Sequence, residues 1–348
     1  MASGEAAGAM SDSQGDPNSS DSSAEAAAGP IRVADLADIP LAVRAVRLRV
    51  QRAKGPQTQS PKRRCLKQQP SRDTETSAAE EDWFHATEHV EELNDFTKNG
   101  PTERKVHMVD LFSASGMAAH TFKSHGYSSK AIDIQLNKGH DITTRAGFFM
   151  ILSVCLALVP GGLILAGPPC SLYILLSSSM HQRSKSRPLG NTCNAKVRLS
   201  NLIVSNMCQL MMQMLARSVK IVVEQPSNSV MFLHPEIKAL QNWEPDSPIF
   251  KKCEWLLVST WMGKFNHDMP KPTRLLSNMG SSRLLARQMS LNQWRQDRAA
   301  GLAQTRQYTR LTPAGVAGGE DLHRSAWYTP EFCLQVFIAW EKEFVSML

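Results

Sequence analysis

The sequence lacks the features that define several large classes of protein. Its most hydrophobic run, residues 148–159, stops at Pro160-Gly161-Gly162, well short of the roughly 20 apolar residues that a membrane span needs. Residues 1–29 have neither a basic start nor an apolar stretch, which argues against a secretory signal peptide. The seven cysteines are odd in number and form no CxxC pair, so neither a zinc ribbon nor a complete disulfide framework is indicated. We therefore expect no membrane span and a reducing compartment.

Aromatic residues are also few, at 7%, and charge is spread unevenly along the 348 residues. A 42% apolar content allows a sizeable core, and the net charge of +7 favours polyanionic partners. Residues 1–30 carry acids but no base and are rich in small residues, which is typical of disorder. The basic cluster 61–67 is either a nuclear-import or nucleic-acid-binding arm, or a solvated tail. We predict a disordered tail over residues 1–80.

Strand and helix patterns alternate from residue 105 onward. This alternation predicts an α/β fold with a doubly wound, Rossmann-like parallel sheet, in which ligands bind outside the carboxyl ends of the strands. The expected strands are residues 106–112, 131–134, 163–166 and 221–223, and the expected helices are residues 117–125, 144–158 and 197–218.

The remaining segments complete a three-part organisation. We expect the α/β domain to span residues 81–235, with a short helix over residues 83–96 packed beside the first strand. Residues 236–348 form a basic part that supplies substrate contacts and completes the sheet. Within it, residues 251–310 interleave eleven bases with tryptophan and phenylalanine, as a surface that binds phosphates and stacks on bases does. The alternative for the basic stretch 283–300 is a solvated structural helix.

Three of the expected strands end in residues suited to chemistry. Residues 110–116 (DLFSASG) form a small-residue loop whose N–H groups can approach a ligand beside a helix N-terminus. Residues 167–171 (GPPCS) present one thiol after two stiff prolines, and residues 224–226 (EQP) place an acid at the next strand end. A cysteine, a carboxylate and a cofactor-type loop are therefore expected to face one another.

This constellation resembles the class I S-adenosylmethionine-dependent methyltransferases, and among them the DNA cytosine-C5 methyltransferases, over about residues 105–235. The resemblance implies S-adenosylmethionine as the cofactor and no metal. The cofactor-binding residues that it implies are Asp110, Phe112, Ser113, Gly116, Asp133, Asp141 and Pro168. It further implies catalysis by Cys170 and Glu224. The substrate contacts that we assign are Ser171, Gln225 and Arg274.

The resemblance also implies a reaction. The Cys170 thiolate adds to C6 of cytosine, which makes C5 nucleophilic toward the sulfonium methyl group. Glu224 neutralises the charge that develops toward N3 by donating a proton or a hydrogen bond. The sequence offers no candidate for the base that removes the C5 proton. The target base has to be extruded from a duplex or already single-stranded.

The sequence departs from the family pattern at several positions. Ala114 stands where the family has the first glycine of its loop, which is tolerable if φ there is negative. Ser171 replaces the glutamine after the cysteine, and Gln225-Pro226 replaces Asn-Val. The Gln-x-Arg-x-Arg strand has only a weak candidate at residues 304–306.

Two other functions remain open. One is methylation of another nucleic-acid or small-molecule group, although the Asp-Pro-Pro-aromatic loop of exocyclic-amine methylation is absent. The other is an inactive, methyltransferase-like protein that binds nucleic acid. We expect a monomer in the nucleus, or otherwise the cytoplasm, with DNA preferred over RNA as partner.

The polar segment after the cysteine, residues 177–196, has two interpretations. It is either a mobile loop that closes over an anionic substrate or a solvated loop. In the first case four bases are candidates for phosphate contacts, namely Arg183, Lys185, Arg187 and Lys196.

Overall fold

The computed structural model describes residues 83–99, 104–174, 177–243, 253–301, 309–312, 315–318 and 324–348. Contacts divide the chain into two units, Met1–Ala37 and Asp38–Leu348, and every described residue belongs to the second. The predicted tail over residues 1–80, its basic cluster 61–67 and the weak arginine-strand candidate 304–306 lie outside the described residues.

One six-stranded sheet organises the described part of the chain, in the order β2-β1-β3-β4-β6-β5. The strands are β1 (Val106–Leu111), β2 (Ser129–Ile132), β3 (Leu158–Ala166), β4 (Lys220–Pro226), β5 (Leu256–Trp261) and β6 (Pro272–Ser277). The first four run parallel, and β6 is antiparallel to both β4 and β5. A separate hairpin pairs β7 (Thr309–Thr312) with β8 (Gly315–Gly318). The predicted α/β class with a mostly parallel sheet is confirmed.

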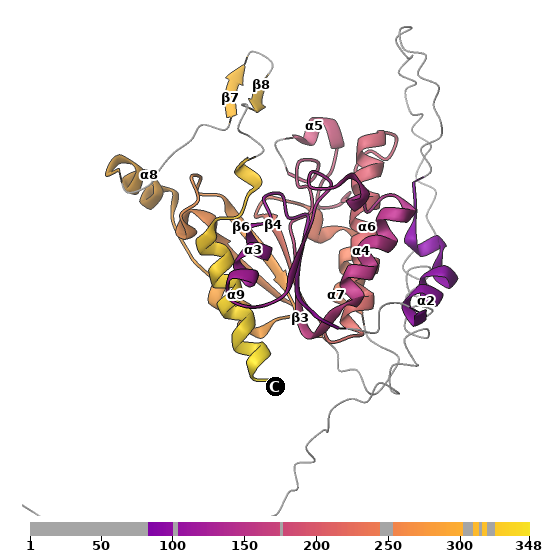
Figure 1. The fold of residues 1–348 in the computed structure, drawn as a ribbon. Coiled ribbons are helices and arrows are strands. Elements are labelled where there is room, and N and C mark those ends of the chain that lie inside the picture. The colour runs from indigo at the N-terminus through magenta and orange to yellow at the C-terminus, as the bar shows by residue number, and fades with distance from the viewer. Residues whose placement is uncertain are drawn as a thin grey trace, which may run out of the picture. The chain divides into compact units, whose positions relative to one another are not determined.

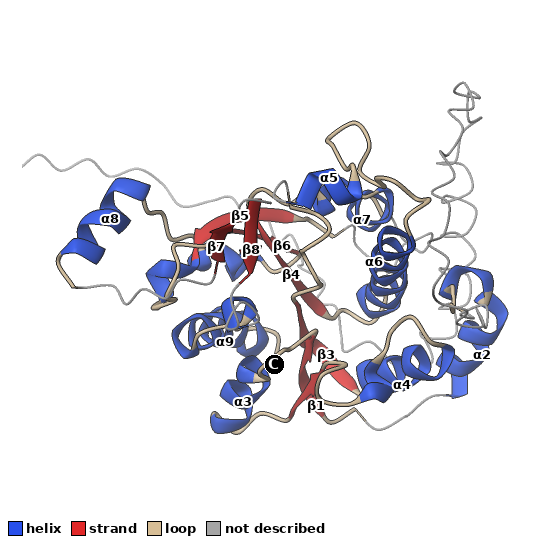
Figure 2. Cartoon of the chain, turned by 90° about the horizontal axis from the view of Figure 1, so that it is seen from above, coloured by secondary structure: helices blue, strands red, loops and turns tan. Residues whose placement is uncertain are grey.

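Helices cover both faces of this sheet, with α3 and α9 on one side and α4 and α6 on the other (Figures 1 and 2). Successive residues of a strand point to opposite faces. Met108 accordingly belongs to the core under α3 and α9, whereas Val109 belongs to the core under α4 and α6. The helices are α2 (Val90–Asn99), α3 (Met117–Ser124), α4 (Arg145–Leu156), α5 (Ser178–His181), α6 (Ala195–Leu215), α7 (Pro235–Gln241), α8 (Leu291–Ala299) and α9 (Pro330–Val345). No described helix is long and apolar enough to cross a membrane.

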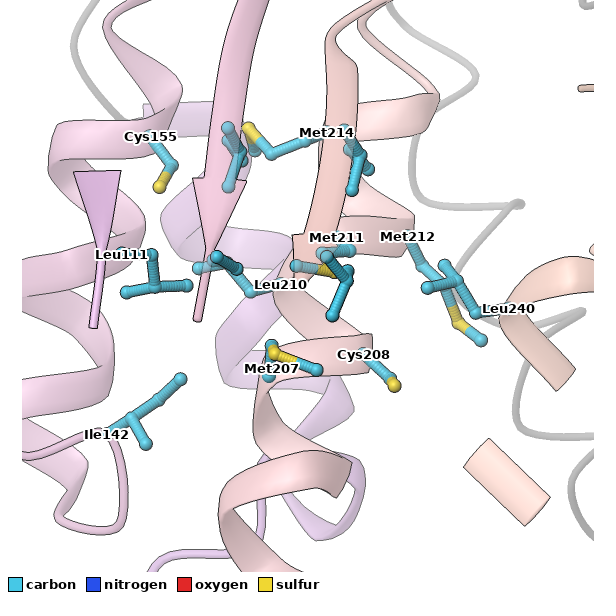
Figure 3. Packing of buried hydrophobic residues seen from close by; sticks show 14 of the residues in the cluster. Leu111, Ile142, Cys155, Met207, Cys208, Leu210, Met211, Met212, Met214 and Leu240 are labelled. Atoms are coloured by element: carbon cyan, nitrogen blue, oxygen red, sulfur yellow. The ribbon is translucent and has the colours of Figure 1, made fainter. Parts of the chain in front are cut away.

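The methionine-rich part of α6 lies in the hydrophobic core (Figure 3). Met207, Met211 and Met214 are fully buried. Cys155 and Cys208 lie in the same cluster, and burial raises the pKa of the Cys155 thiol to about 12. Both cysteines are therefore inert small hydrophobes rather than candidate nucleophiles.

Two parts of the sheet differ from the sequence prediction. β3 begins at Leu158 rather than at residue 163, because a register shift against β1 lets the strand absorb Pro160-Gly161-Gly162. The antiparallel strands β5 and β6 were not predicted, because β5 is short and its exposed and buried positions alternate rather than forming a continuous buried run. The expected helix over residues 283–300 divides into a 3-10 helix, Gly280–Leu285, and α8.

A helical segment lies at each end of the described region, namely Ala86–Glu88 with α2 at the N-terminal end and α9 at the C-terminal end. The predicted N-terminal helix is a 3-10 turn, Ala86–Glu88, followed by α2, and its contacts are with α4 and α6 rather than with the expected first strand. Phe84 packs on Phe148 with ring centroids 5.3 Å apart. At the other end α9 begins at Pro330, and Trp340 Nε1 donates to Gly161 O (2.9 Å), which ties the helix to β3.

Candidate active site

The site lies where the strand order of the sheet reverses. The chain moves from β1 to β2 on one side and returns to β3 on the other side of β1, and in such sheets ligands bind outside the carboxyl ends at this point. The last residues of the two strands, Leu111 and Ala166, are register partners. Gly167 N then donates to Leu111 O (3.1 Å). The loop after β1 and the proline-cysteine loop after β3 therefore start side by side.

The loop after β1 turns through three residues with left-handed backbone. Phe112, Ala114 and Gly116 have φ of 61°, 47° and 70°. Left-handed backbone costs an alanine about 1–2 kcal/mol, so the positive φ of Ala114 makes its departure from glycine a source of strain. The Ala114 N–H donates to Asp133 Oδ2 (2.9 Å), and Ser113 N donates to Ile132 O (3.1 Å). The end of β2 thus holds the strained loop in place.

The two predicted acids after β2 belong to one closed turn. His140 Nδ1 accepts from Asp133 N (3.1 Å), which folds the segment back on itself. Asp141 Oδ1 accepts from the N–H (2.9 Å) and the hydroxyl (2.6 Å) of Thr143 and so shapes the entry to α4. Asp133 therefore reaches the candidate cofactor loop directly, whereas the hydrogen bonds of Asp141 are local.

Asp110 is a buried carboxyl group at the end of β1. Its Oδ2 accepts from Ala119 N in α3 (3.3 Å), and its side chain is fully buried. Burial raises the pKa of Asp110 to about 8, the nearby charge of Asp133 adding to the rise. At neutral pH Asp110 therefore lies in the site mostly as a neutral acid.

The proline-cysteine loop is fastened to β4 by Gln225. This buried side chain donates through Nε2 to Pro168 O (2.7 Å) and accepts from Ser229 Oγ through Oε1 (2.8 Å). Both ends of the amide are thus used within the protein. From the sequence we assigned Gln225 to substrate binding. In the structure its buried amide instead positions the loop that carries Cys170.

Cys170 and Glu224, the predicted catalytic pair, face the same region. Burial raises the pKa of the Cys170 thiol, the charge of Glu224 raises it further, and the ammonium of Lys271 lowers it. Glu224 is 6% exposed, and Cys170 is a partly exposed free thiol. The thiol and the carboxylate are therefore close enough for their charges to interact.

Lys271 is a site residue to which the sequence alone assigned no role. Its Nζ lies 3.7 Å from Glu224 Oε1, and both side chains are largely buried. The sequence had assigned the half-buried Arg274 to the substrate, and β6 pairs Arg274 with Gln225 in register. The antiparallel pairing of β6 with β4 places the first residues of β6 opposite the last residues of β4. Lys271, which directly precedes β6, therefore lies near Glu224.

Tyr328 is a second site residue without a sequence signal. It precedes α9, and its hydroxyl lies 2.5 Å from the position that a Cβ on Gly167 would take. The ring is 8% exposed. Burial and the charges of Glu224 and Asp110 raise the pKa of Tyr328, so the phenol is a neutral hydrogen-bond donor. Glycine at position 167 is therefore required by the approach of this hydroxyl.

Four buried polar atoms at this edge of the sheet have no hydrogen-bond partner among the described residues. They are Asp110 Oδ1, Ser113 Oγ, Glu224 Oε1 and Tyr328 OH. Buried polar groups in folded proteins are almost always hydrogen-bonded, and leaving one unsatisfied costs about 1–3 kcal/mol. Two of these atoms lie at the end of β1 and in the loop after it, one lies on β4 and one lies just before α9, and we interpret them as groups that a polar ligand can bind.

The segment after Cys170 is pinned rather than free to close. Arg183 is 3% exposed, and its guanidinium donates to Leu172 O (2.7 Å), Asn201 Oδ1 (2.8 Å) and Ser200 Oγ (2.7 Å). It also lies 3.9 Å from the centroid of the Tyr173 ring. The expectation that Arg183 contacts phosphate was wrong, because its guanidinium N–H groups donate to acceptors inside the protein. Ser171, Lys185, Arg187 and Lys196 are exposed and stay candidates for substrate contacts.

We predict that Arg183→Met lowers the free energy of unfolding by about 3 kcal/mol, because it leaves several buried oxygens without a donor. Urea unfolding followed by circular dichroism measures this. Arg187→Met removes an exposed arginine of the same loop and should change stability by less than about 0.5 kcal/mol. Equal effects of the two substitutions would contradict the pinned loop.

Comparison with known proteins adds no identification. No family model matches the chain, and no curated protein matches it. Among the described residues, no group of three or more histidine, cysteine, aspartate or glutamate side chains could hold a metal ion. The geometry of the site therefore carries the functional argument.

Proposed function

We propose that the protein is an S-adenosylmethionine-dependent methyltransferase that acts on C5 of cytosine in nucleic acid through a Cys170 adduct. The observation that carries the proposal is that Gln225, the residue after Glu224 on β4, donates to Pro168 O (2.7 Å) and so fastens the loop that carries Cys170 beside the strand that carries Glu224. The end of β1 and the loop after it contribute two buried polar atoms without a hydrogen-bond partner in the described region, Asp110 Oδ1 and Ser113 Oγ.

The residues of the first loop fit the proposed cofactor. When bound, S-adenosylmethionine supplies an electrophilic methyl group. Asp110 Oδ1 and Ser113 Oγ are unpartnered buried atoms that can bind its polar amino-acid part, and Gly116 opens α3, whose N-terminus favours a carboxylate. Asp133 lies beside this loop, and its oxygens can each accept one more hydrogen bond from a ribose hydroxyl.

The second half of the site fits a flat heterocycle. Cys170 Sγ adds to C6 of the ring, and Glu224 donates a proton or hydrogen bond to N3 as negative charge develops there. Gln225 fixes the loop that carries the thiol through Pro168 O. The residue that removes the C5 proton is not assigned.

The substrate side of the proposal rests on charge. Lys185, Arg187 and Lys196 are exposed in the segment that follows the Cys170 loop, where they can contact phosphates. We propose DNA rather than RNA as the substrate, a monomeric enzyme, and a nuclear location drawn from the basic cluster 61–67.

Calorimetric titration of the full chain with S-adenosylmethionine tests the proposal. We expect saturable binding at one site, weakened at least about tenfold by Asp133→Ala, because this substitution removes the ribose acceptor and the anchor of the loop. Glu91→Gln, on the exposed side of α2, is the matched control and should leave binding unchanged. Absence of binding to the wild-type chain would contradict every methyltransferase function.

A non-enzymatic function is favoured by two observations on the loop after β1. Ala114 is held in left-handed backbone where a glycine would be unstrained, and part of the Asp133 carboxylate is already used by the loop. A methyltransferase-like protein that binds nucleic acid without cofactor would tolerate both. Such a protein would bind DNA in a salt-dependent manner and give no heat with S-adenosylmethionine.

A further inference from the structure

Three ionisable side chains from three different segments meet at the catalytic end of the sheet. Cys170 follows β3, Glu224 lies on β4, and Lys271 directly precedes β6. Lys271 Nζ is 3.7 Å from Glu224 Oε1, which is beyond hydrogen-bond distance, and this oxygen has no other partner among the described residues. The loop that carries Cys170 is fastened to β4 next to Glu224, because Gln225 Nε2 donates to Pro168 O (2.7 Å), and the charges of Glu224 and Lys271 both act on the thiol.

The backbone holds Lys271 in a strained but fixed position. Its φ is 34°, in the region that favours glycine. Its carbonyl accepts from Met262 N (3.1 Å) and from Thr273 Oγ1 (2.9 Å), so the strained residue is held from both sides. Phe112 and Ala114 of the candidate cofactor loop share this left-handed backbone. Strain of this kind persists where the surroundings over-determine it, and it clusters at functional sites.

Three further titratable groups near these side chains are mostly neutral near pH 7, and the charge of Asp268 acts on one of them, His267. Burial lowers the pKa of His267, which lies close to Lys271, and the ammonium of Lys271 lowers it further. Burial and neighbouring carboxylates raise the pKa of Tyr328, and burial raises that of Asp110 to about 8. The charge balance of the site near neutral pH therefore rests mainly on Cys170, Glu224 and Lys271.

The reaction needs two protonation states that a simple ion pair does not provide. A Glu224 carboxylate paired with the Lys271 ammonium leaves Cys170 as a thiol, and a second buried anion beside Glu224 is unfavourable. Attack on C6 requires a thiolate, whereas stabilisation at N3 requires a protonated carboxyl group. Moving one proton from Sγ to the carboxylate provides both states and leaves the total charge of the three groups unchanged.

We propose that Lys271 is the shared counter-ion of this proton exchange: the proton leaves Cys170 Sγ for Glu224, and the ammonium that balanced the carboxylate then balances the thiolate. Lys271 is thus a positioning residue that acts through Cys170 and Glu224. The inference rests on the proposed function and adds a lysine to the pair that the sequence identified.

The pH dependence of Cys170 alkylation in the full chain, without cofactor, tests this role. Iodoacetamide reacts with the thiolate, and mass mapping of the labelled peptide distinguishes Cys170 from the other cysteines. We expect Lys271→Met to raise the pH midpoint of Cys170 labelling by about one unit, which lowers the rate near neutral pH about tenfold. Lys271→Arg keeps the charge and should stay within a few-fold of wild type.

Glu224→Gln gives the opposite result and covers the case in which a lysine variant does not fold. Removing the carboxylate should lower the labelling midpoint and raise the rate, while methyl transfer is lost because no acid faces N3. Lys271→Gln is the second lysine variant, and thermal unfolding checks that each protein is folded.

Two failures are distinguishable in this design. An unshifted labelling midpoint in folded Lys271→Met and Lys271→Gln, or an equal shift in Lys271→Arg, would overturn the role of Lys271. If the variants show shifts of the expected sign but the wild-type chain binds no S-adenosylmethionine and transfers no methyl group, the proposed function is overturned. The coupling between the thiol and the lysine is then still supported.

Discussion

Replacing Cys170 by serine should lower methyl transfer to cytosine by on the order of 10³-fold or more while leaving the affinity for S-adenosylmethionine within a few-fold. A serine hydroxyl occupies nearly the same volume, but its far higher pKa removes the anion that adds to C6. The cofactor loop after β1 contacts other residues, so its shape should persist. Transfer of a labelled methyl group to cytosine-containing DNA and calorimetry on the same protein measure the two effects.

Cys253→Ser is the matched control for this experiment. Cys253 is also a free, partly buried cysteine, but it lies just before β5 and outside the predicted site. Its replacement should change neither transfer nor cofactor affinity. Parallel loss of transfer and cofactor binding in Cys170→Ser would argue for a structural role of Cys170, because a nucleophile contributes to the chemical step alone.

Asp110→Asn should stabilise the protein increasingly as pH rises. The pKa of Asp110 is raised by burial from 3.8 to about 8, so the folded state binds the proton more tightly than the unfolded state does. The stability that this proton contributes is fully present below about pH 4 and is lost as pH rises through about 8. Asparagine does not titrate and can still accept from Ala119 N. The variant should therefore gain on the order of 5 kcal/mol over wild type between these limits.

Urea unfolding of both proteins at intervals from about pH 4 to about pH 9 measures this difference. The gap between the two free energies of unfolding should widen by about 1.4 kcal/mol per pH unit across the window and then level off. Glu91→Gln removes an exposed carboxylate and should show no such widening. A gap that is constant with pH would show that Asp110 does not titrate in this range, and would remove the argument that it is a neutral acid in the site.

The sequence predicted β1 and β4 well because nearly all residues of these two strands are buried. β1 and β4 begin and end within a few residues of their predicted bounds, and their hydrophobic runs are bounded by polar or turn residues. The antiparallel strands β5 and β6 were missed because a hairpin at the sheet edge alternates exposed and buried side chains. Its pattern is weaker than that of a buried strand.

Site residues that directly follow a hydrophobic strand could be predicted from the sequence. Site residues that distant segments of the chain bring together could not. Cys170 and Glu224 each follow a hydrophobic strand, and the parallel arrangement brings such ends together. Tyr328 comes 160 residues after Pro168 in the chain, and only the docking of α9 on β3 brings it over Gly167. The position of Lys271 near Glu224 depends on the antiparallel pairing of β6 with β4, which the sequence did not indicate.

Arg183 shows the limit of inference from composition. Its segment is polar and basic, which is typical of a loop that contacts phosphate. Long arginine side chains also fold back onto carbonyl groups, and which of the two occurs depends on whether acceptors are present nearby. The acceptors of Arg183 come from the turn after Cys170 and from α6, elements whose juxtaposition is a tertiary property.

Covalent trapping on a 5-fluorocytosine-containing strand tests the thiol mechanism most directly. A base removes the C5 proton of cytosine but cannot remove fluorine from C5 in the same way. An enzyme that adds Cys170 to C6 and transfers the methyl group is therefore held as a covalent adduct. In the presence of S-adenosylmethionine we expect a species with the summed mass of protein and strand, attached at Cys170 and absent from Cys170→Ser. Methyl transfer to cytosine without any adduct, or an adduct at another residue, would contradict the account.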